Sequence, residues 1–164
     1  MLKRLSQTLI LLTFLFLCSL LVLPTAGFTE QAVQPTAEDR CMTCGMRVAP
    51  YPNWVAQVTF KDGRHYFFDG PKDMFVFYFN LQDYLPEATT DDIDQLQVTE
   101  YYTLKRRSAR DVFFVSGSDV LGPMGKEMVP VSGEDNLKTF LRDHGYEKVM
   151  RFDGAALNAV ELQP

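Results

Sequence analysis

Two cysteines and two methionines stand within six residues, in the run Cys41-Met42-Thr43-Cys44-Gly45-Met46. Thiolates and thioethers are soft ligands, and Cu(I) is the first-row biological ion that prefers them most. The Cys-x-x-Cys spacing alone is ambiguous, because it also occurs in zinc sites and in thiol redox sites. The methionine two residues after the second cysteine favours copper, since neither zinc nor disulfide chemistry needs it.

Three other interpretations of Cys41 and Cys44 stay open. A closed zinc site needs four nitrogen or sulfur ligands, and only His65 and His144 are left to complete one. A redox pair is expected at the start of a helix, whereas a glycine and two prolines follow Cys44 here. The third is a structural disulfide, although a bridge around two intervening residues would remove little entropy from the unfolded chain.

Three more residues are candidate copper ligands. Gly45 lets the backbone turn sharply, so the Met46 thioether can fold back toward the thiols, although methionine is also a common core residue. Met124 lies in the loop Gly122-Pro123-Met124-Gly125, where it does not pack an obvious core face. His65 is a secondary candidate, and its alternative is an exposed histidine on a strand.

The remaining polar and sulfur side chains are given structural roles. Met128 is expected in the core, and His144 is expected to complement the dipole at the end of a helix. Asp69 and Asp73 stand four apart at a helix start, which favours capping over acid–base chemistry. Since the sequence has no Ser-His-Asp order, phosphate loop or His-Glu metal motif, we predict that the protein is not an enzyme.

The chain of 164 residues is predicted to be exported. Residues 1–27 have the form of a signal peptide, with Lys3 and Arg4 before an apolar stretch; the alternative is a retained membrane anchor through residues 5–23. Removing residues 1–27 takes away two of the 16 basic and none of the 21 acidic residues, which changes the net charge from −5 to −7. This charge argues against nucleic acid as a partner, and we expect a periplasmic or other extracytoplasmic location.

The folded domain is expected over residues 40–154, after a flexible linker at 28–39 and before a tail at 155–164. In a first half, about 40–103, strands at 54–61 and 65–68 form a hairpin. A helix opens at Asp69-Gly70-Pro71 and ends near Asn80, and a strand covers 96–102. The cluster Lys105-Arg106-Arg107 is expected in a solvated loop.

The second half, about 104–154, has the same order. Strands are expected at 111–116 and 127–131, with a glycine-containing loop between them. Ser132 can cap a helix at 133–144, with Asp135 completing a capping box, and Gly145 ends the helix. A strand at 146–152 closes the half. The predicted class is α+β, with two ββαβ-like halves whose small antiparallel sheets are each covered by a helix.

These residues resemble the nitrous oxide reductase accessory protein family, whose members are exported copper-binding proteins of denitrifying bacteria. The resemblance covers about residues 40–153. It is carried by Cys41-Met42-Thr43-Cys44-Gly45-Met46, by Gly122-Pro123-Met124-Gly125 after Gly117-Ser118, and by the ending 140–152. A departure is Phe68-Asp69-Gly70, which stands where many members have a third thiol.

The resemblance implies a Cu(I) chaperone that supplies nitrous oxide reductase or its maturation machinery, with a fold similar to organomercurial lyase. It also implies copper ligation by Cys41 or Cys44 together with Met124. Many members are lipoproteins, but Cys18 follows a bulky leucine and is a poor lipidation site. The main alternative function is a thiol–disulfide oxidoreductase acting on a partner's copper-site cysteines.

Overall fold

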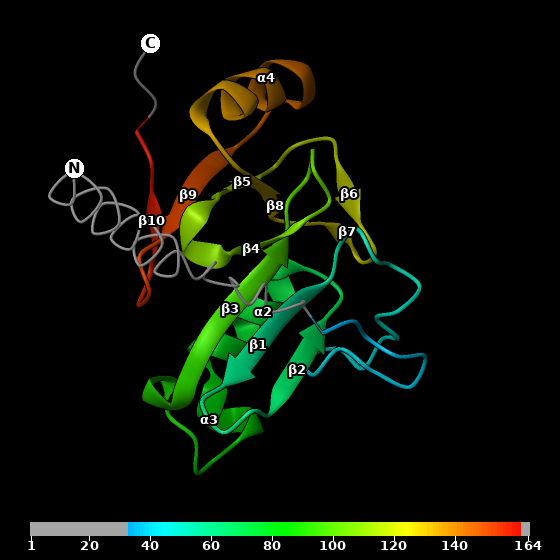
Figure 1. Cartoon of the computed structure of the whole chain (residues 1–164). Helices are drawn as coiled ribbons and strands as arrows, with labels where there is room; N and C mark the ends of the chain where they lie inside the picture. The colour runs from blue at the N-terminus through cyan, green and yellow to red at the C-terminus, as the bar shows by residue number, and fades with distance from the viewer. Residues whose placement is uncertain (1–32, 162–164) are drawn as a thin grey trace, which may run out of the picture. The chain divides into compact units, whose positions relative to one another are not determined.

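The computed structural model describes residues 33–161 of the protein, which carry two four-stranded antiparallel sheets (Figure 1). The expected signal at 1–27 and the expected linker up to residue 32 lie outside the described residues. Among the described residues, no helix is long and apolar enough to cross a membrane.

The first sheet has the strand order β2-β1-β3-β4. Its elements along the chain are β1 (Ala56–Phe60), β2 (His65–Phe68), α2 (Pro71–Phe79), α3 (Leu81–Tyr84), β3 (Ile93–Thr99) and β4 (Arg106–Ser108). The expected hairpin is confirmed, with Ala56 opposite Phe68 and Thr59 opposite His65. The expected helix after it is confirmed as α2, which has a proline in its first turn.

The second sheet repeats this arrangement with the order β10-β9-β5-β8. Its elements are β5 (Phe113–Ser116), β8 (Val129–Val131), α4 (Glu134–His144), β9 (Lys148–Phe152) and β10 (Leu157–Ala159). In each sheet the first strand pairs with the second and the third, and the fourth pairs with the third. The two halves therefore share one topology, and the predicted α+β class with two related sheets is confirmed.

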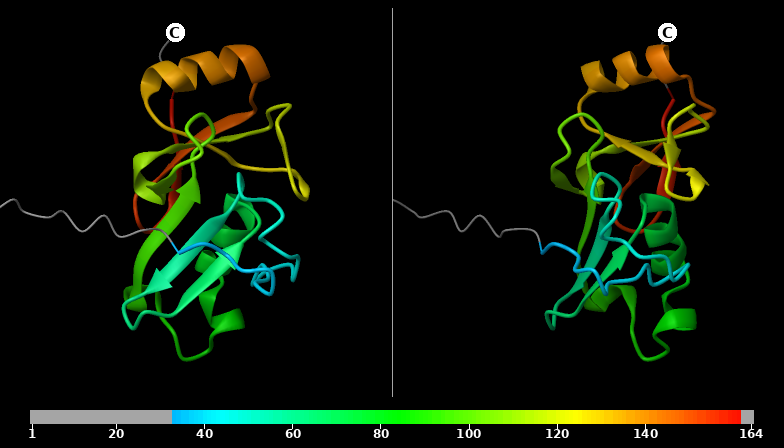
Figure 2. Two further views of the ribbon diagram at one scale, coloured as in Figure 1. Left: turned by 45° about the vertical axis from the view of Figure 1, so that its right-hand side comes forward. Right: turned by 90° about the vertical axis from the view of Figure 1, so that its right-hand side faces the viewer.

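Helix α2 packs between the two sheets. Its side chain Phe75 meets Phe114 of β5 at a ring-centroid distance of 5.0 Å and Phe152 of β9 at 5.2 Å. The same helix joins the hydrophobic cluster that contains Val58 and Phe60 of β1. Helix α4 covers the opposite face of the second sheet, where Phe140 packs among the residues of a second cluster. Figures 1 and 2 show α4 at one end of the described domain and the first sheet at the other.

Several local expectations were wrong. Residues 106–108 are not a solvated loop but the edge strand β4, in which Arg106 is half-buried and donates to the Gln57 side chain at 3.4 Å. The segment expected as a tail forms β10, since Leu157 pairs with Phe152. Ser132 does not cap α4, because its N-cap is Gly133 and no side chain bonds there.

The glycine-containing loop of the second half holds a miniature hairpin. Strands β6 (Leu121–Gly122) and β7 (Gly125–Lys126) pair with Leu121 opposite Lys126. Pro123 and Met124 form its turn, and Gly125 has a φ of 88°, which glycine adopts without strain. The first half has only a tight turn at the equivalent place, between β1 and β2, so this hairpin is particular to the second half.

We predict that Phe75→Ala lowers the free energy of unfolding by about 3–5 kcal/mol, because the lost ring joins the helix to both sheets. Urea denaturation followed by circular dichroism measures the change. Val76→Ala is the matched control on the same helix; its side chain is exposed, so its effect should stay within about 0.5 kcal/mol. Equal effects of the two substitutions would contradict the packing of α2 between the sheets.

Candidate metal centre

The cysteine motif forms a closed loop that precedes β1 in the chain. Arg40 and Arg47 pair as an isolated antiparallel bridge. Inside that bridge, the Cys41 N–H donates to the Met46 carbonyl at 2.7 Å, and the Gly45 N–H donates to the Cys41 carbonyl at 2.8 Å. Gly45 has a φ of 76°, so the sharp backbone turn expected at this glycine is confirmed.

Two hydrogen bonds to backbone carbonyls help to hold the loop on the first half. The Met42 N–H donates to the Phe67 carbonyl of β2 at 3.2 Å. The Thr43 hydroxyl donates to the backbone carbonyl of Asp73, in the first turn of α2, at 2.9 Å. Because the two anchors belong to consecutive elements, the loop lies over the segment that joins β2 to α2.

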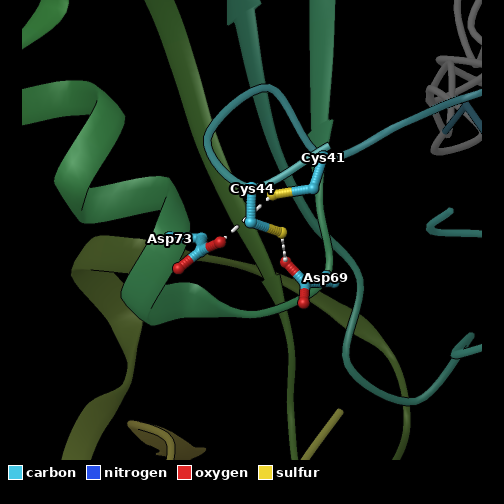
Figure 3. A group of neighbouring side chains, drawn as sticks. All are labelled: Cys41, Cys44, Asp69 and Asp73. Carbon is cyan, nitrogen blue, oxygen red and sulfur yellow. Dashed lines mark hydrogen bonds between the residues drawn. The ribbon is translucent and has the colours of Figure 1, made fainter. Parts of the chain in front are cut away.

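Four side chains converge where the loop meets this segment (Figure 3). The ligand atoms of Cys41, Cys44, Asp69 and Asp73 all lie within 4.8 Å of one another. The Cys41 thiol donates to Asp73 Oδ2 at 3.3 Å, and the Cys44 thiol donates to Asp69 Oδ1 at 3.5 Å. Both cysteines are free thiols; Cys41 is buried and Cys44 is exposed.

The two aspartates do more than the sequence indicated. Asp73 lies in the first turn of α2 as expected, where it complements the helix dipole. The N-cap, however, is Gly70, which has no side chain with which to make a capping bond. Asp69 precedes the helix and bonds to Cys44 instead. The carboxylates are therefore part of the thiol site, which the sequence analysis missed.

This environment keeps both thiols protonated. Burial is the main cause that raises the pKa of the Cys41 thiol, and the Asp69 carboxylate raises it further. Burial also raises the pKa of Cys44, to which Asp73 and the charge of Asp69 contribute. Each proton is shared with an oxygen acceptor, so loss of a proton would place a thiolate beside carboxylates.

The methionines of the two motifs are accessible to different degrees. Met46 is half-buried in the cysteine loop, and its backbone carbonyl accepts the Cys41 N–H. Met124 is 54% exposed in the turn between β6 and β7. The hairpin that carries Met124 is tied to the start of α2, because the Lys72 ammonium donates to the Lys126 carbonyl at 3.0 Å.

The two histidines lie apart from the cysteine cluster. His65 is exposed at the start of β2 and packs edge-on against Phe67 at 5.3 Å. Asp69 lies four residue steps further along the chain, a distance of about 13 Å at the usual rise of a strand. His144 ends α4, where it contacts Asp119 at 2.9 Å and the Tyr101 hydroxyl at 3.3 Å. Among the described residues, the cluster thus contains no histidine.

A buried carboxylate beside the cluster also escaped the sequence analysis. Glu127, expected only as a strand residue, is 6% exposed. Its Oε1 accepts the Lys72 N–H at 2.7 Å and the Met128 N–H at 2.9 Å. Burial raises the pKa of Glu127 to about 7. A lone glutamate near the end of a loop has no sequence signal that would have revealed this burial.

The fold and the site together define an α+β protein with a sulfur- and carboxylate-lined candidate metal centre at the start of a helix. The chain belongs to the NosL family, whose model matches residues 32–159. Among solved structures, it is similar to the crystal structure of the copper chaperone NosL from Shewanella denitrificans, with a TM-score of 0.62 and 23% sequence identity. The match covers 75% of this chain and 93% of that chain. No curated protein matches the chain.

We predict that iodoacetamide alkylates Cys44 but not Cys41 in the native protein, because only Cys44 is exposed. Since a raised pKa leaves less thiolate at a given pH, Cys44 should react more slowly than a small free thiol near pH 8. Asp69→Asn should increase its rate, and both cysteines should react alike in denaturing urea. Peptide mapping by mass spectrometry measures each rate; an unchanged or slower reaction of Cys44 in Asp69→Asn would contradict this account.

Proposed function

We propose that the protein is an exported carrier of Cu(I) that supplies copper for the assembly of nitrous oxide reductase or a similar copper enzyme. Membership of the NosL family supports this proposal. The structurally similar protein from Shewanella denitrificans is described as a copper chaperone. The role proposed for this chain is that of a binding protein, with no chemical turnover of its own.

The observation that carries the proposal is that two free thiols, those of Cys41 and Cys44, lie within 4.8 Å of each other in a loop that also contains Met46. Thiol and thioether sulfur suit monovalent copper better than zinc, calcium or magnesium. Cys44 is exposed while Cys41 is buried beneath it. An ion that enters from solvent can therefore contact the Cys44 sulfur directly.

We propose that Cys41 and Cys44 hold the ion, that Met124 caps it, and that Met46 assists. The charges of the site indicate an order among these ligands. One monovalent ion cannot offset two thiolates beside the carboxylates of Asp69 and Asp73, which lie within 4.8 Å of them. Cys44 is therefore the first thiolate ligand, and Cys41 is a second that joins when its proton is lost. His65 is the weakest candidate because of its place at the far end of β2.

An exposed site also supports release of the ion. A carrier must give up its metal to a partner, and stepwise exchange of ligands needs an open side for the incoming sulfur or imidazole. Cys44 and Met124 are both exposed, so an acceptor can approach the ion while the buried Cys41 still retains it. The proposed acceptor is nitrous oxide reductase or its maturation machinery.

The proposed place of action is the periplasm or another extracytoplasmic compartment. It follows from the signal-like residues 1–27, which are also the basis for a possible membrane association through residues 5–23. Delivery to an exported copper enzyme would occur in that same compartment, as part of denitrification where nitrous oxide reductase is the acceptor.

A thiol–disulfide oxidoreductase is the alternative function. The nearness of Cys41 and Cys44 is compatible with a reversible disulfide. Catalytic redox cysteines, however, have a lowered pKa and are exposed as thiolates, whereas burial raises the pKa of both thiols here. This environment argues against attack on a disulfide, because little of either cysteine is thiolate in the metal-free protein.

We predict that the mature domain binds one equivalent of Cu(I) and that Cys44→Ser weakens binding by at least about 100-fold, a larger loss than changes next to a metal site usually cause. Met124→Leu, which removes only the sulfur, should weaken it by about 10- to 100-fold. Anaerobic titration against a coloured Cu(I) chelator measures both affinities.

Met128→Leu is the matched control for this titration. Met128 lies four residues after Met124 but packs against the hydrophobic core, so its loss of sulfur should leave the affinity unchanged. A wild-type domain that cannot compete with the chelator, or a Cys44→Ser variant with full affinity, would contradict the proposal.

We also predict that the apparent affinity for Cu(I) rises with pH between about pH 6 and about pH 8. Both thiols have a raised pKa, so a proton must leave each thiol that becomes a ligand. The affinity should increase about tenfold per pH unit for each proton released. The same chelator titration, repeated across this range, measures the slope; a slope of zero would mean that no thiol ionises on binding.

A further inference from the structure

Glu127 occupies an unusual position for a carboxylate. It directly follows β7 and lies three residues after Met124, yet it is 6% exposed. Burial of a polar group is costly unless hydrogen bonds replace those that it makes with water. The groups that donate hydrogen bonds to the Glu127 carboxylate therefore compensate for its loss of water.

The partner of Glu127 is the start of α2. The first N–H groups of a helix have no partner within the helix, and α2 has no capping side chain of its own. The Lys72 N–H donates to Glu127 Oε1 at 2.7 Å, although the two residues are 55 positions apart in the chain. The glutamate thus caps the helix from the second half of the chain, and its charge suits the positive end of the helix dipole.

Two glycines make room for the Glu127 side chain. Gly70 has an extended backbone that any residue can adopt, but a Cβ at this position would overlap the Glu127 carboxylate. A Cβ at Gly122, in β6, would lie 3.0 Å from the Glu127 Cβ. The carboxylate is therefore clamped between the residue before α2 and the hairpin that carries Met124.

The hairpin needs such an anchor. Its strands β6 and β7 have two residues each, and a hairpin this short is not stable by itself in water. The ion pair of Lys126 with Glu147 is fully on the surface, at 3.9 Å, and pairs of this kind contribute little. The half-buried bond from Lys72 to Glu127 joins the hairpin to α2, and the exposed bond from Lys72 to Lys126 lies beside it.

We propose that Glu127 is a positioning residue, which locks the hairpin onto the start of α2 and thereby holds Met124 where it can cap an ion bound at Cys44. This role rests on the proposed function, because it assumes that Met124 is a ligand. The same helix start carries Asp73, which bonds to Cys41. One helix end therefore aligns both halves of the site.

A double-mutant cycle tests the proposal. Glu127→Ala should weaken Cu(I) binding on the order of tenfold, as for other residues that orient a ligand. Glu127→Gln should restore most of this loss, because its amide oxygen can still accept the Lys72 N–H. In a Met124→Leu background, Glu127→Ala should cause no further loss. A full additional loss in that background would show that Glu127 acts on something other than Met124 and would overturn the proposal.

A buried carboxylate elsewhere provides the matched control. Glu100 is 0% exposed, and its carboxylate accepts the backbone N–H groups of Thr103 and Ser132, which lie outside the hairpin. Glu100→Ala should lower the melting temperature without weakening Cu(I) binding. If it weakened binding as much as Glu127→Ala, a general loss of stability would explain both effects, and the proposal would fail.

Hydrogen exchange of the metal-free protein gives a readout that does not depend on copper. Glu127→Ala should speed amide exchange at residues 121–126, and Glu127→Gln should not; equal exchange in all three proteins would overturn the proposal. The failure of the proposed function is a separate result, namely a wild-type domain that binds no Cu(I). If Met124→Leu alone keeps full affinity, the proposed roles of Met124 and Glu127 are both contradicted, whereas the proposal that the protein carries Cu(I) is not.

Discussion

The organisation of this site depends on the first turn of one helix, α2. The start of α2 lacks a capping side chain of its own, and two distant segments bind there. The cysteine loop bonds to the side chain and the carbonyl of Asp73. The hairpin of the second half reaches Lys72 through Glu127. Both segments are therefore joined to the same helix turn.

The duplicated topology explains how this convergence arises. Both halves place their second strand beside the first and their third on its other side. In the first half the hairpin turn is short, whereas in the second half the same connection is extended by β6 and β7. The cysteine loop is likewise an extension that precedes β1. The candidate site is therefore made of additions to a repeated scaffold, and α2 serves both halves because it packs between the sheets.

The sequence predicted those features that depend on local pattern. The alternation of β1, the turn pair Asp62-Gly63 before β2 and the apolar run of α2 were enough to place these elements, and the cysteine motif pointed to the candidate site. The roles of Asp69 and Asp73 were not predictable, since their bonds to thiols join residues 25 and 32 positions apart. Glu127 was missed because a glutamate is ordinarily exposed, and only the fold reveals the helix end that accepts it. Strand β10 was missed because its three residues gain their order from pairing with β9.

The central claim is that sulfur atoms from the cysteine loop and from the hairpin bind the same ion. X-ray absorption at the copper edge, on domain loaded anaerobically with one equivalent of Cu(I), tests it most directly. The account predicts an all-sulfur first shell that loses one sulfur neighbour in Met124→Leu and keeps its full shell in Met128→Leu. An identical copper environment in wild type and Met124→Leu would contradict the claim, because the hairpin would then contribute no ligand.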